Sequence, residues 1–177
     1  KLCFFYFLWR KIYHKSHLVI TNSQFLKNKI LKYYRKTTVE ILFPSIINTN
    51  KKYFPNKHKP IGLISGSVHK GEDVLLSISQ KLPKLNFIIY NSTMELGFPE
   101  NVKCLGYTNR DEIFSNISLL LVPSTWNETF GRIVVESQLG GIPCLCHGIG
   151  GLKESQIIED FIVSFNDIEN WVNKINY

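Results

Sequence analysis

The chain has 177 residues, 44% of them hydrophobic and 20% charged, with a formal net charge of +7. That is enough apolar material for a domain with a buried core. No run of about 18 apolar residues occurs, so no segment is expected to span a bilayer. The aromatic start, LCFFYFLW, lacks the small-residue cleavage site of a signal peptide. Because the chain opens on Lys1 and has one methionine, Met94, we expect a piece of a longer protein.

The charge is divided unevenly along the chain. Residues 1–59 hold 13 Lys and Arg against the single acid Glu40, whereas residues 60–177 hold 8 Lys and Arg against 13 Asp and Glu. The basic region suits nucleic acid, anionic lipid headgroups or an acidic partner. A solvated basic face, in an organism rich in Lys, Asn and Ile codons, explains it equally well. Because a nucleic-acid function rests only on charge and aromatic residues, no nucleic-acid partner is expected.

The first third of the chain contains two short strands around one helix. HLVIT (17–21) is a β-branched strand, the helix follows within residues 23–36, and VEILFP (39–44) is the next strand. A polar linker, NTNKKYFPNKHK (48–59), separates these elements from the rest of the chain. The charge balance changes sign there, so we place a domain boundary within residues 38–59.

Strands and helices alternate through the remainder. Strands are expected at 60–65, 85–90, 101–107, 118–124, 142–147 and 161–165, and helices at 72–82, 110–116, from Phe130 onward, near 153–158 and at 167–175. The apolar runs are continuous, which is typical of parallel strands buried on both faces. Strand–helix repetition with short connections predicts an α/β fold, a Rossmann-like parallel sheet flanked by helices.

Such a sheet binds ligands at the carboxyl ends of its strands. Four loops follow predicted strands, at residues 66–71, 107–110, 123–131 and 148–151, and are expected to converge on one edge. The phosphate-binding pattern of P-loop NTPases and the G-x-G-x-x-G of dinucleotide enzymes are both missing. A phosphate group can still bind at a helix N-terminus, through free N–H groups and the positive end of the helix dipole.

The helix that follows Phe130 offers such an N-terminus, and two glutamates flank its start. Glu128 and Glu136 lie eight positions apart, which in a continuous helix is a rise of about 12 Å. Glu128 is placed to accept hydrogen bonds from sugar hydroxyls, and Glu136 from a ribose diol. The alternative for each is a surface glutamate favoured by the helix dipole.

The cysteines at positions 3, 104, 144 and 146 could in principle belong to a metal site. Cys144 and Cys146 precede His147, but the sequence contains no second Cys/His pair with the spacing needed to complete a metal site. Two alternate cysteines in an apolar strand are more often small core residues. We therefore expect no metal site here, and unpaired cysteines fit a reducing cytoplasm.

Residues 123–154, PSTWNETFGRIVVESQLGGIPCLCHGIGGLKE, resemble the signature of the retaining family 4 glycosyltransferases of the GT-B fold. That signature joins Pro-Ser, Glu-x-Phe-Gly, a second Glu eight residues after the first, Gly-x-Pro-Val and Gly-Gly-x-x-Glu. The resemblance extends from about His17 to the end. It implies that residues 1–38 end the acceptor-side domain, that 39–59 form the interdomain crossing and linker, and that 60–177 bind a nucleoside diphosphate sugar.

The resemblance also implies a role for each matching residue. Glu128 contacts the donor sugar, Glu136 binds the ribose and Lys70 neutralises the departing diphosphate. Backbone amides of Phe130, Gly131, Arg132 and Ile133 reach the distal phosphate and sugar, Tyr107 lies beside the base, and Gly66, Ser67 and Thr129 complete the donor site. The implied reaction transfers a hexose with retention of anomeric configuration and needs no metal or other cofactor. The alternative is a degenerate module that binds nucleotides without catalysis.

Two departures from the family pattern stand out. The family's Gly-Arg followed by Lys-Gly is here the shorter Gly66-Ser67-Val68-His69-Lys70-Gly71, without the arginine. His69 and Arg132 are candidate substitutes, and His69 is equally an exposed loop residue. Nearly all of the acceptor-side domain is absent, so the chain alone is expected to bind a donor without completing an active site.

The basic, aromatic N-terminal segment has two interpretations. Lys1, Arg10, Lys11 and Lys15, among Phe4, Phe5, Phe7 and Trp9, fit a membrane-surface anchor. The preferred alternative is that Phe4, Phe7 and Trp9 bury against the missing domain. The expected location is the cytoplasm, with peripheral contact at the inner membrane surface, and the acceptor is a sugar, a lipid-linked glycan or a protein.

Overall fold

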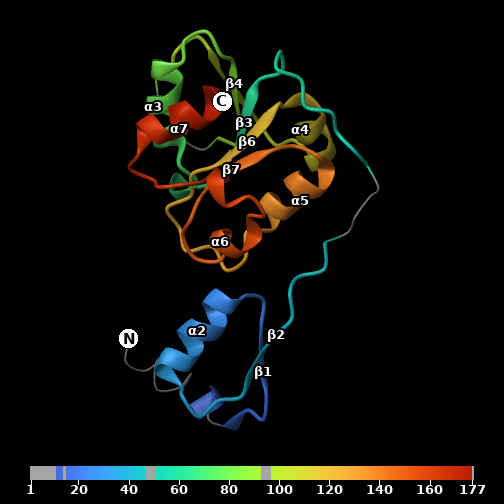
Figure 1. Ribbon diagram of the computed structural model, residues 1–177, viewed down its shortest axis with the longest axis vertical. Coiled ribbons are helices and arrows are strands. Elements are labelled where there is room, and N and C mark those ends of the chain that lie inside the picture. Colours follow the sequence, from blue (N-terminus) through green and yellow to red (C-terminus); the bar gives the residue numbers. More distant parts are fainter. Residues whose placement is uncertain (1–10, 14, 47–50, 93–96, 177) are drawn as a thin grey trace. The chain divides into compact units, whose positions relative to one another are not determined.

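The computed structural model describes residues 11–13, 15–46, 51–92 and 97–176. Its contacts divide the chain into two units, Lys1–Ser45 and Ile46–Tyr177 (Figure 1). The division falls within the segment where charge and composition place a domain boundary. The aromatic residues of the N-terminal segment, Phe4, Phe5, Phe7 and Trp9, lie outside the described residues.

The N-terminal unit is a strand–helix–strand arrangement. Strand β1 (Val19–Thr21) pairs in parallel with β2 (Val39–Ile41), and α2 (Gln24–Tyr33) connects them. Helix α2 begins where the Ser23 hydroxyl accepts a hydrogen bond from the Leu26 amide at 3.1 Å, because this satisfies one of the unpaired N–H groups of the first turn. The predicted interdomain crossing, residues 39–59, therefore begins with strand β2, which belongs to the N-terminal unit.

The C-terminal unit alternates strands and helices along its whole length. Its strands are β3 (Ile61–Ile64), β4 (Phe87–Tyr90), β5 (Val102–Leu105), β6 (Leu119–Val122), β7 (Cys144–His147) and β8 (Ile162–Val163). Its α-helices are α3 (Glu72–Lys81), α4 (Arg110–Asn116), α5 (Arg132–Gly140), α6 (Leu152–Ser155) and α7 (Ile168–Asn176), with short 3-10 turns at Val68–Lys70 and Glu159–Phe161.

The six strands form one parallel sheet in the order β5-β4-β3-β6-β7-β8. The chain builds outward from β3 through β4 to β5, and then returns to β6 on the other side of β3. This is the doubly wound Rossmann order. The side on which the next strand is added changes between β3 and β6, and this position is the switch point of the sheet. The predicted Rossmann-like parallel sheet is confirmed, and its switch point lies between the loops that follow β3 and β6.

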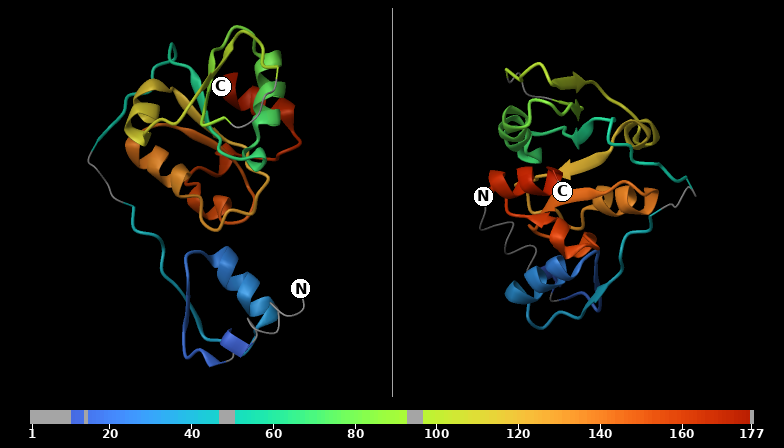
Figure 2. Two further views of the ribbon diagram at one scale, coloured as in Figure 1. Left: turned by 180° about the vertical axis from the view of Figure 1, so that it is seen from behind. Right: turned by 45° about the horizontal axis from the view of Figure 1, so that its top comes forward.

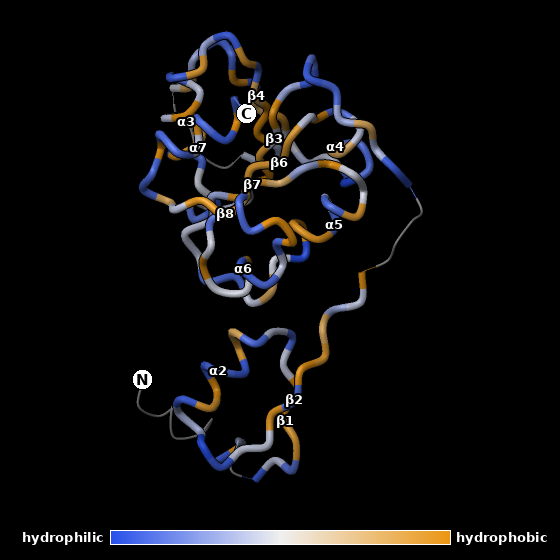
Figure 3. Tube along the Cα trace, viewed as in Figure 1, coloured by the Kyte–Doolittle hydropathy of each residue, from blue (hydrophilic) through white to orange (hydrophobic). Residues whose placement is uncertain are grey.

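Helices cover both faces of the sheet, as the views in Figure 2 show. Helices α3 and α7 lie on one face, where Leu75, Ile78 and Trp171 pack against Leu63 and Leu121 of the sheet. Helices α4, α5 and α6 lie on the other face, over a second core that includes Phe114, Val134, Cys144 and Cys146. Figure 3 shows the central strands among the most hydrophobic parts of this unit. Burial on both faces explains why their sequences are continuously apolar.

The start of α5 differs from its predicted position at Phe130. The helix begins at Arg132, because Gly131 has φ of +72° and precedes the first turn in a left-handed conformation. A side chain at this position would place its Cβ 2.6 Å from Leu152 Cδ2. The left-handed backbone conformation therefore favours glycine here, and any larger residue would also have to displace the end of the Leu152 side chain. The predicted helix at 110–116 is confirmed.

Candidate functional site

The two loops at the switch point are tied to each other through their backbones. The Thr125 amide donates a hydrogen bond to the carbonyl oxygen of His69 at 2.9 Å, and the Ser124 hydroxyl donates to the same oxygen at 3.2 Å. Gly71, with φ of +82°, leaves no room for a Cβ, which would lie 2.4 Å from the Pro123 carbonyl oxygen. The loop carrying Lys70 is thus held directly against the loop carrying Glu128.

A cavity of about 220 Å³ opens at this point, and we call it the switch-point cavity. It is lined by residues from two loops, from the end of β6 and from the N-terminal halves of α4, α5 and α6: Lys70, Arg110, Val122, Glu128, Gly131, Arg132, Ile133, Glu136 and Leu152. The sequence predicts six of these as site residues, namely Lys70, Glu128, Gly131, Arg132, Ile133 and Glu136. These six predicted residues, up to 66 positions apart in the chain, therefore share one cavity.

The two predicted catalytic residues contact each other. Lys70 Nζ forms an ion pair with Glu128 Oε1, and both side chains are partly buried. The Ser124 hydroxyl also faces Glu128 Oε1, at 3.5 Å. A fixed cation and a fixed carboxylate therefore lie side by side at the switch point.

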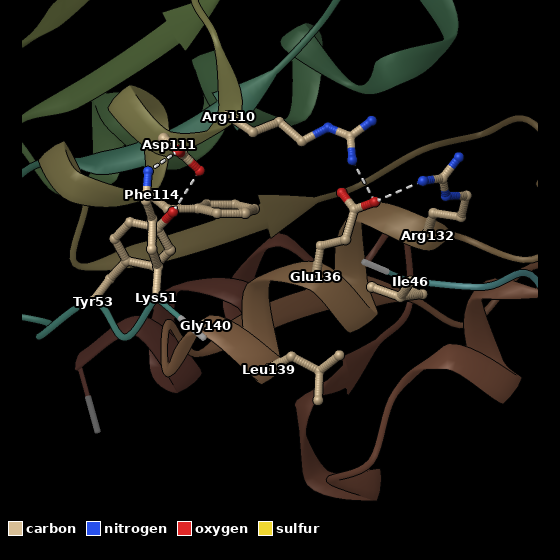
Figure 4. Close-up of a pocket in the computed structure, with 10 residues that line it drawn as sticks. All are labelled: Ile46, Lys51, Tyr53, Arg110, Asp111, Phe114, Arg132, Glu136, Leu139 and Gly140. Atoms are coloured by element: carbon tan, nitrogen blue, oxygen red, sulfur yellow. Dashed lines mark hydrogen bonds and ion pairs between the residues drawn. The ribbon is translucent and has the colours of Figure 1, made fainter. Parts of the chain in front are cut away.

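Glu136 is the most buried charged group of the cavity, with its side chain 9% exposed. Its Oε1 atom pairs with Arg110 and, at 3.2 Å, with Nη2 of Arg132 (Figure 4). Its Oε2 atom is buried and has no hydrogen-bond partner among the residues that the structure describes. An unpartnered buried carboxylate oxygen is costly, so Glu136 retains the capacity to accept a further hydrogen bond.

The first turn of α5 adds backbone donors to the cavity wall. The leading N–H groups of a helix have no partner within the helix, and here they belong to the segment Gly131–Ile133 that lines the cavity. The positive end of the helix dipole points the same way. Together with Lys70, Arg110 and Arg132, this makes the cavity wall favourable for an anionic group.

The other predicted site residues are not part of the cavity lining. Among the described residues that line it, Gly66, Ser67, Tyr107, Thr129 and Phe130 do not occur. Tyr107 is 91% exposed, whereas Phe130 is buried. The roles of all five remain predictions.

Sequence reasoning missed Arg110 as a site residue. It appears there only as the end of a loop and the start of a helix. Asn109 caps α4 by accepting a hydrogen bond from the Glu112 amide at 3.0 Å, and Arg110 is the first residue of that helix. Its position after the strand β5, in a loop expected at the ligand edge, was the available signal.

A second hollow of about 230 Å³ lies between α4 and α5, and we call it the α4–α5 groove. It shares Arg110, Arg132 and Glu136 with the switch-point cavity (Figure 4). At its other end the Tyr53 hydroxyl donates to Asp111 Oδ1 at 2.7 Å, and Lys51 pairs with the same carboxylate. Burial first, and then the hydrogen bond to Asp111, raise the pKa of Tyr53 to about 12.

Cys144 and Cys146 are both buried core residues, as predicted. Burial raises the pKa of the Cys146 thiol to about 11 and that of Cys144 well above its ordinary value. Both therefore stay protonated at neutral pH. Within the part of the chain that the structure describes, no group of three or more His, Cys, Asp or Glu side chains is placed to hold a metal ion. No helix among the same residues has the length and hydrophobicity needed to cross a bilayer.

Comparison with known families decides the classification. The family model of the glycosyl transferases group 1 matches residues 56–177, which is the whole sheet with its flanking helices. The chain belongs to the glycosyl transferases group 1 family. Two curated relatives of this chain illustrate the range of similarity. An uncharacterized 42.6 kDa protein in the cps region of Klebsiella pneumoniae is 26% identical over 159 residues, covering 84% of this chain and 43% of the relative. The D-inositol 3-phosphate glycosyltransferase of Mycobacterium marinum is 27% identical over 127 residues, covering 60% and 27%.

Solved structures show the same fold. Sucrose-phosphate synthase from Thermosynechococcus elongatus superposes with a TM-score of 0.81 at 16% identity, over 97% of this chain and 51% of that one. Anabaena HepE, in complex with UDP-glucose, gives 0.80 at 21% identity, over 97% and 56%. These likenesses establish the Rossmann-like, GT-B type of fold. The chain spans about half the length of these two structures, and less than half of the two curated relatives above.

Proposed function

We propose that this chain is the donor-binding half of a retaining glycosyltransferase, which takes a hexose from a nucleoside diphosphate sugar. The observation that carries the proposal is the switch-point cavity. It combines cations and a helix N-terminus, which favour a diphosphate, with a buried Glu136 oxygen that has no partner and favours a diol.

Each part of the donor then has a matching part of the cavity. The diphosphate lies against the first turn of α5 and near Lys70, and the ribose donates hydroxyl hydrogens to Glu136. Glu128 receives hydroxyls of the sugar from the opposite end of the same wall. The exposed Tyr107 and the loop around it face the base, and Gly66, Ser67, Thr129 and Phe130 shape the surrounding loops.

The same groups favour the transfer step. Negative charge builds on the diphosphate as the bond to the sugar breaks, so a fixed cation and fixed amides stabilise the transition state more than the bound donor. Lys70 is the proposed cation, and no metal is required for this role. Because Lys70 pairs with Glu128, the donor displaces that contact and places its phosphate and sugar between the two side chains.

Solved relatives support the nature of the donor. Structures of Anabaena HepE contain UDP or UDP-glucose, and that protein shares the fold of this chain. The acceptor-contacting domain of a complete enzyme would join the present chain through the linker at residues 39–59, so transfer itself is proposed for the longer protein.

Calorimetric titration of the chain with UDP, GDP and ADP tests the proposal. We expect selective binding of one nucleotide, weakened at least tenfold in Glu136→Ala because a buried charged acceptor is lost. Circular dichroism shows whether both proteins are folded. A folded wild-type chain that binds none of the three nucleotides contradicts the proposal.

One observation favours a second candidate, a nucleotide-binding module without catalysis. The loop from Gly66 to Gly71 lacks the arginine of the family pattern and is shorter. A transfer assay on the longer protein separates the two functions. The enzyme loses transfer in Glu128→Ala, whereas the module shows no transfer before or after the substitution.

A further inference from the structure

Arg110 lies in the switch-point cavity although no motif points to it. Its guanidinium group pairs with Glu136 Oε1, an atom that also receives Arg132. One carboxylate oxygen thus faces two guanidinium groups, while the second oxygen has no partner. Glu136 therefore keeps a cationic neighbour if Arg110 moves away.

The charges of the cavity leave Arg110 available for an anion. Three cationic side chains, Lys70, Arg110 and Arg132, line the cavity against two carboxylates, Glu128 and Glu136. Lys70 pairs with Glu128, and Arg110 and Arg132 share Glu136, so the cavity holds one guanidinium group more than its carboxylates balance. Of the two arginines that share Glu136, Arg110 has the more exposed side chain, at 56% against 51%, so it can change partners with little loss of packing.

The loop after β3 makes a second cation necessary. In this chain the loop from Gly66 to Gly71 carries Lys70 and, at the other positions, no Lys or Arg. A diphosphate in the switch-point cavity has more negative charge than Lys70 alone balances. Arginine suits the remaining phosphate because its planar fork of N–H groups matches phosphate oxygens in pairs.

We propose that Arg110 is a donor-binding residue that contacts the diphosphate and replaces the cation absent from the loop after β3. On binding, Arg110 exchanges Glu136 Oε1 for phosphate oxygens, and Glu136 keeps Arg132 and accepts the ribose hydroxyls. The inference rests on the proposed function, because it assumes a nucleoside diphosphate in the switch-point cavity.

A purely structural role for Arg110 makes a different prediction. If Arg110 only holds the buried side chain of Glu136 in place, the loss of Arg110 disturbs the ribose contact. The nucleoside and the nucleoside diphosphate then lose affinity by the same factor. If Arg110 binds phosphate, only the diphosphate loses affinity.

The experiment compares the nucleotide selected from UDP, GDP and ADP with its parent nucleoside. The proteins are the wild-type chain, Arg110→Gln, Arg110→Lys and a control, Lys103→Gln, which removes an exposed charge from the edge strand β5. Calorimetry measures the diphosphate, and ligand-observed NMR measures the weaker nucleoside. Thermal unfolding followed by circular dichroism shows that each variant is folded.

We expect Arg110→Gln to weaken diphosphate binding roughly ten- to a hundredfold, the range of a lost charge-assisted hydrogen bond, and to leave nucleoside binding unchanged. Arg110→Lys should recover part of the loss, and Lys103→Gln should match the wild type. Added salt should weaken the Arg110→Gln complex less steeply than the wild-type complex, because one charge contact is missing.

Equal losses for nucleoside and diphosphate, or unchanged affinity for both, would overturn the inference while leaving the proposed function intact. A folded wild-type chain that binds none of the three diphosphates overturns the proposed function and this inference with it.

Discussion

Glu128 and Glu136 occupy one cavity, but their surroundings differ. Glu128 is paired with Lys70 and is accessible from the cavity, whereas Glu136 is almost completely buried and has one unpartnered oxygen. The sequence shows only two glutamates eight positions apart. The structure shows that Glu128 lies beside a partly buried lysine, whereas Glu136 is held between two arginines.

This difference predicts opposite effects of two conservative substitutions on binding. Glu128→Gln should leave the affinity for the nucleoside diphosphate unchanged or raise it, because Lys70 loses its competing carboxylate, and should weaken binding of the corresponding nucleotide sugar. Glu136→Gln should weaken both ligands about tenfold or more. Calorimetry with both ligands measures the pattern. Equal losses for the two ligands in Glu128→Gln would contradict the assignment of Glu128 to the sugar.

At the scale of elements, the start of α5 depends on one glycine. Gly131→Ala introduces a Cβ at φ of +72° and 2.6 Å from Leu152 Cδ2, so we expect the free energy of unfolding to fall by about 1–3 kcal/mol. Gly106→Ala is the matched control, because nothing lies within 4 Å of its added Cβ. Urea titration followed by circular dichroism measures both. Similar stabilities of the two variants would show that α6 yields easily and that the contact is unimportant.

The segment from Lys51 to Lys59 is attached to α4 and α5 by Tyr53. The Tyr53 amide donates a hydrogen bond to the Gly140 carbonyl oxygen at 2.7 Å. The Tyr53 ring packs on Phe114, and the Tyr53 hydroxyl donates to Asp111. Because the pKa of Tyr53 is raised from 10.0 to about 12, its contribution to stability is complete below pH 10 and is lost as the pH rises toward 12.

Tyr53→Phe should therefore lower the free energy of unfolding by about 1 kcal/mol at neutral pH, the usual value of one hydrogen bond. The difference between wild type and variant should shrink between pH 10 and pH 12. Urea unfolding at a series of pH values measures this difference. A difference that stays constant across that interval would mean that the Tyr53 hydroxyl makes no pH-dependent contribution.

The order of elements was predictable from the sequence because continuous apolar strands alternate with helices of ordinary length. Helix α4 matches its predicted range, and Cys144 and Cys146 lie in the core as their strand pattern indicates. The start of α5 was misplaced by two residues, because the Phe130–Gly131 segment is helical by hydrophobic pattern but Gly131 is left-handed. The glycine is compatible with a left-handed residue before the helix, but the hydrophobic pattern alone does not show that it adopts this conformation.

The same limit applies to the site. Lys70, Glu128 and Glu136 follow strands or a helix start in recognisable motifs, so the sequence identifies them. For Arg110 the sequence offers only its place in a loop at the ligand edge, since its partner Glu136 is 26 positions away on another helix. Contacts between neighbouring helices depend on sheet order, which the sequence pattern does not specify.

At the scale of the whole molecule, the doubly wound order places the site. Successive strands are added on one side of β3 up to β5 and on the other side from β6 onward. The loops that follow β3 and β6 carry Lys70 and Glu128. The chain also spans only about half of its solved relatives, and its contacts separate residues up to Ser45 from the C-terminal unit. We therefore expect nucleotide binding from this chain and sugar transfer only from the longer protein.

The most direct test of the central claim is to map a bound nucleotide onto the amides of the ¹⁵N-labelled chain by NMR, using UDP, GDP and ADP in turn. The account predicts that the selected nucleotide shifts the amide signals of Gly131, Arg132 and Ile133 most strongly, together with Lys70 and the loop around Tyr107. Shifts confined to other parts of the sheet, or no shifts from any of the three nucleotides in a folded chain, would contradict the claim that the switch point holds the donor.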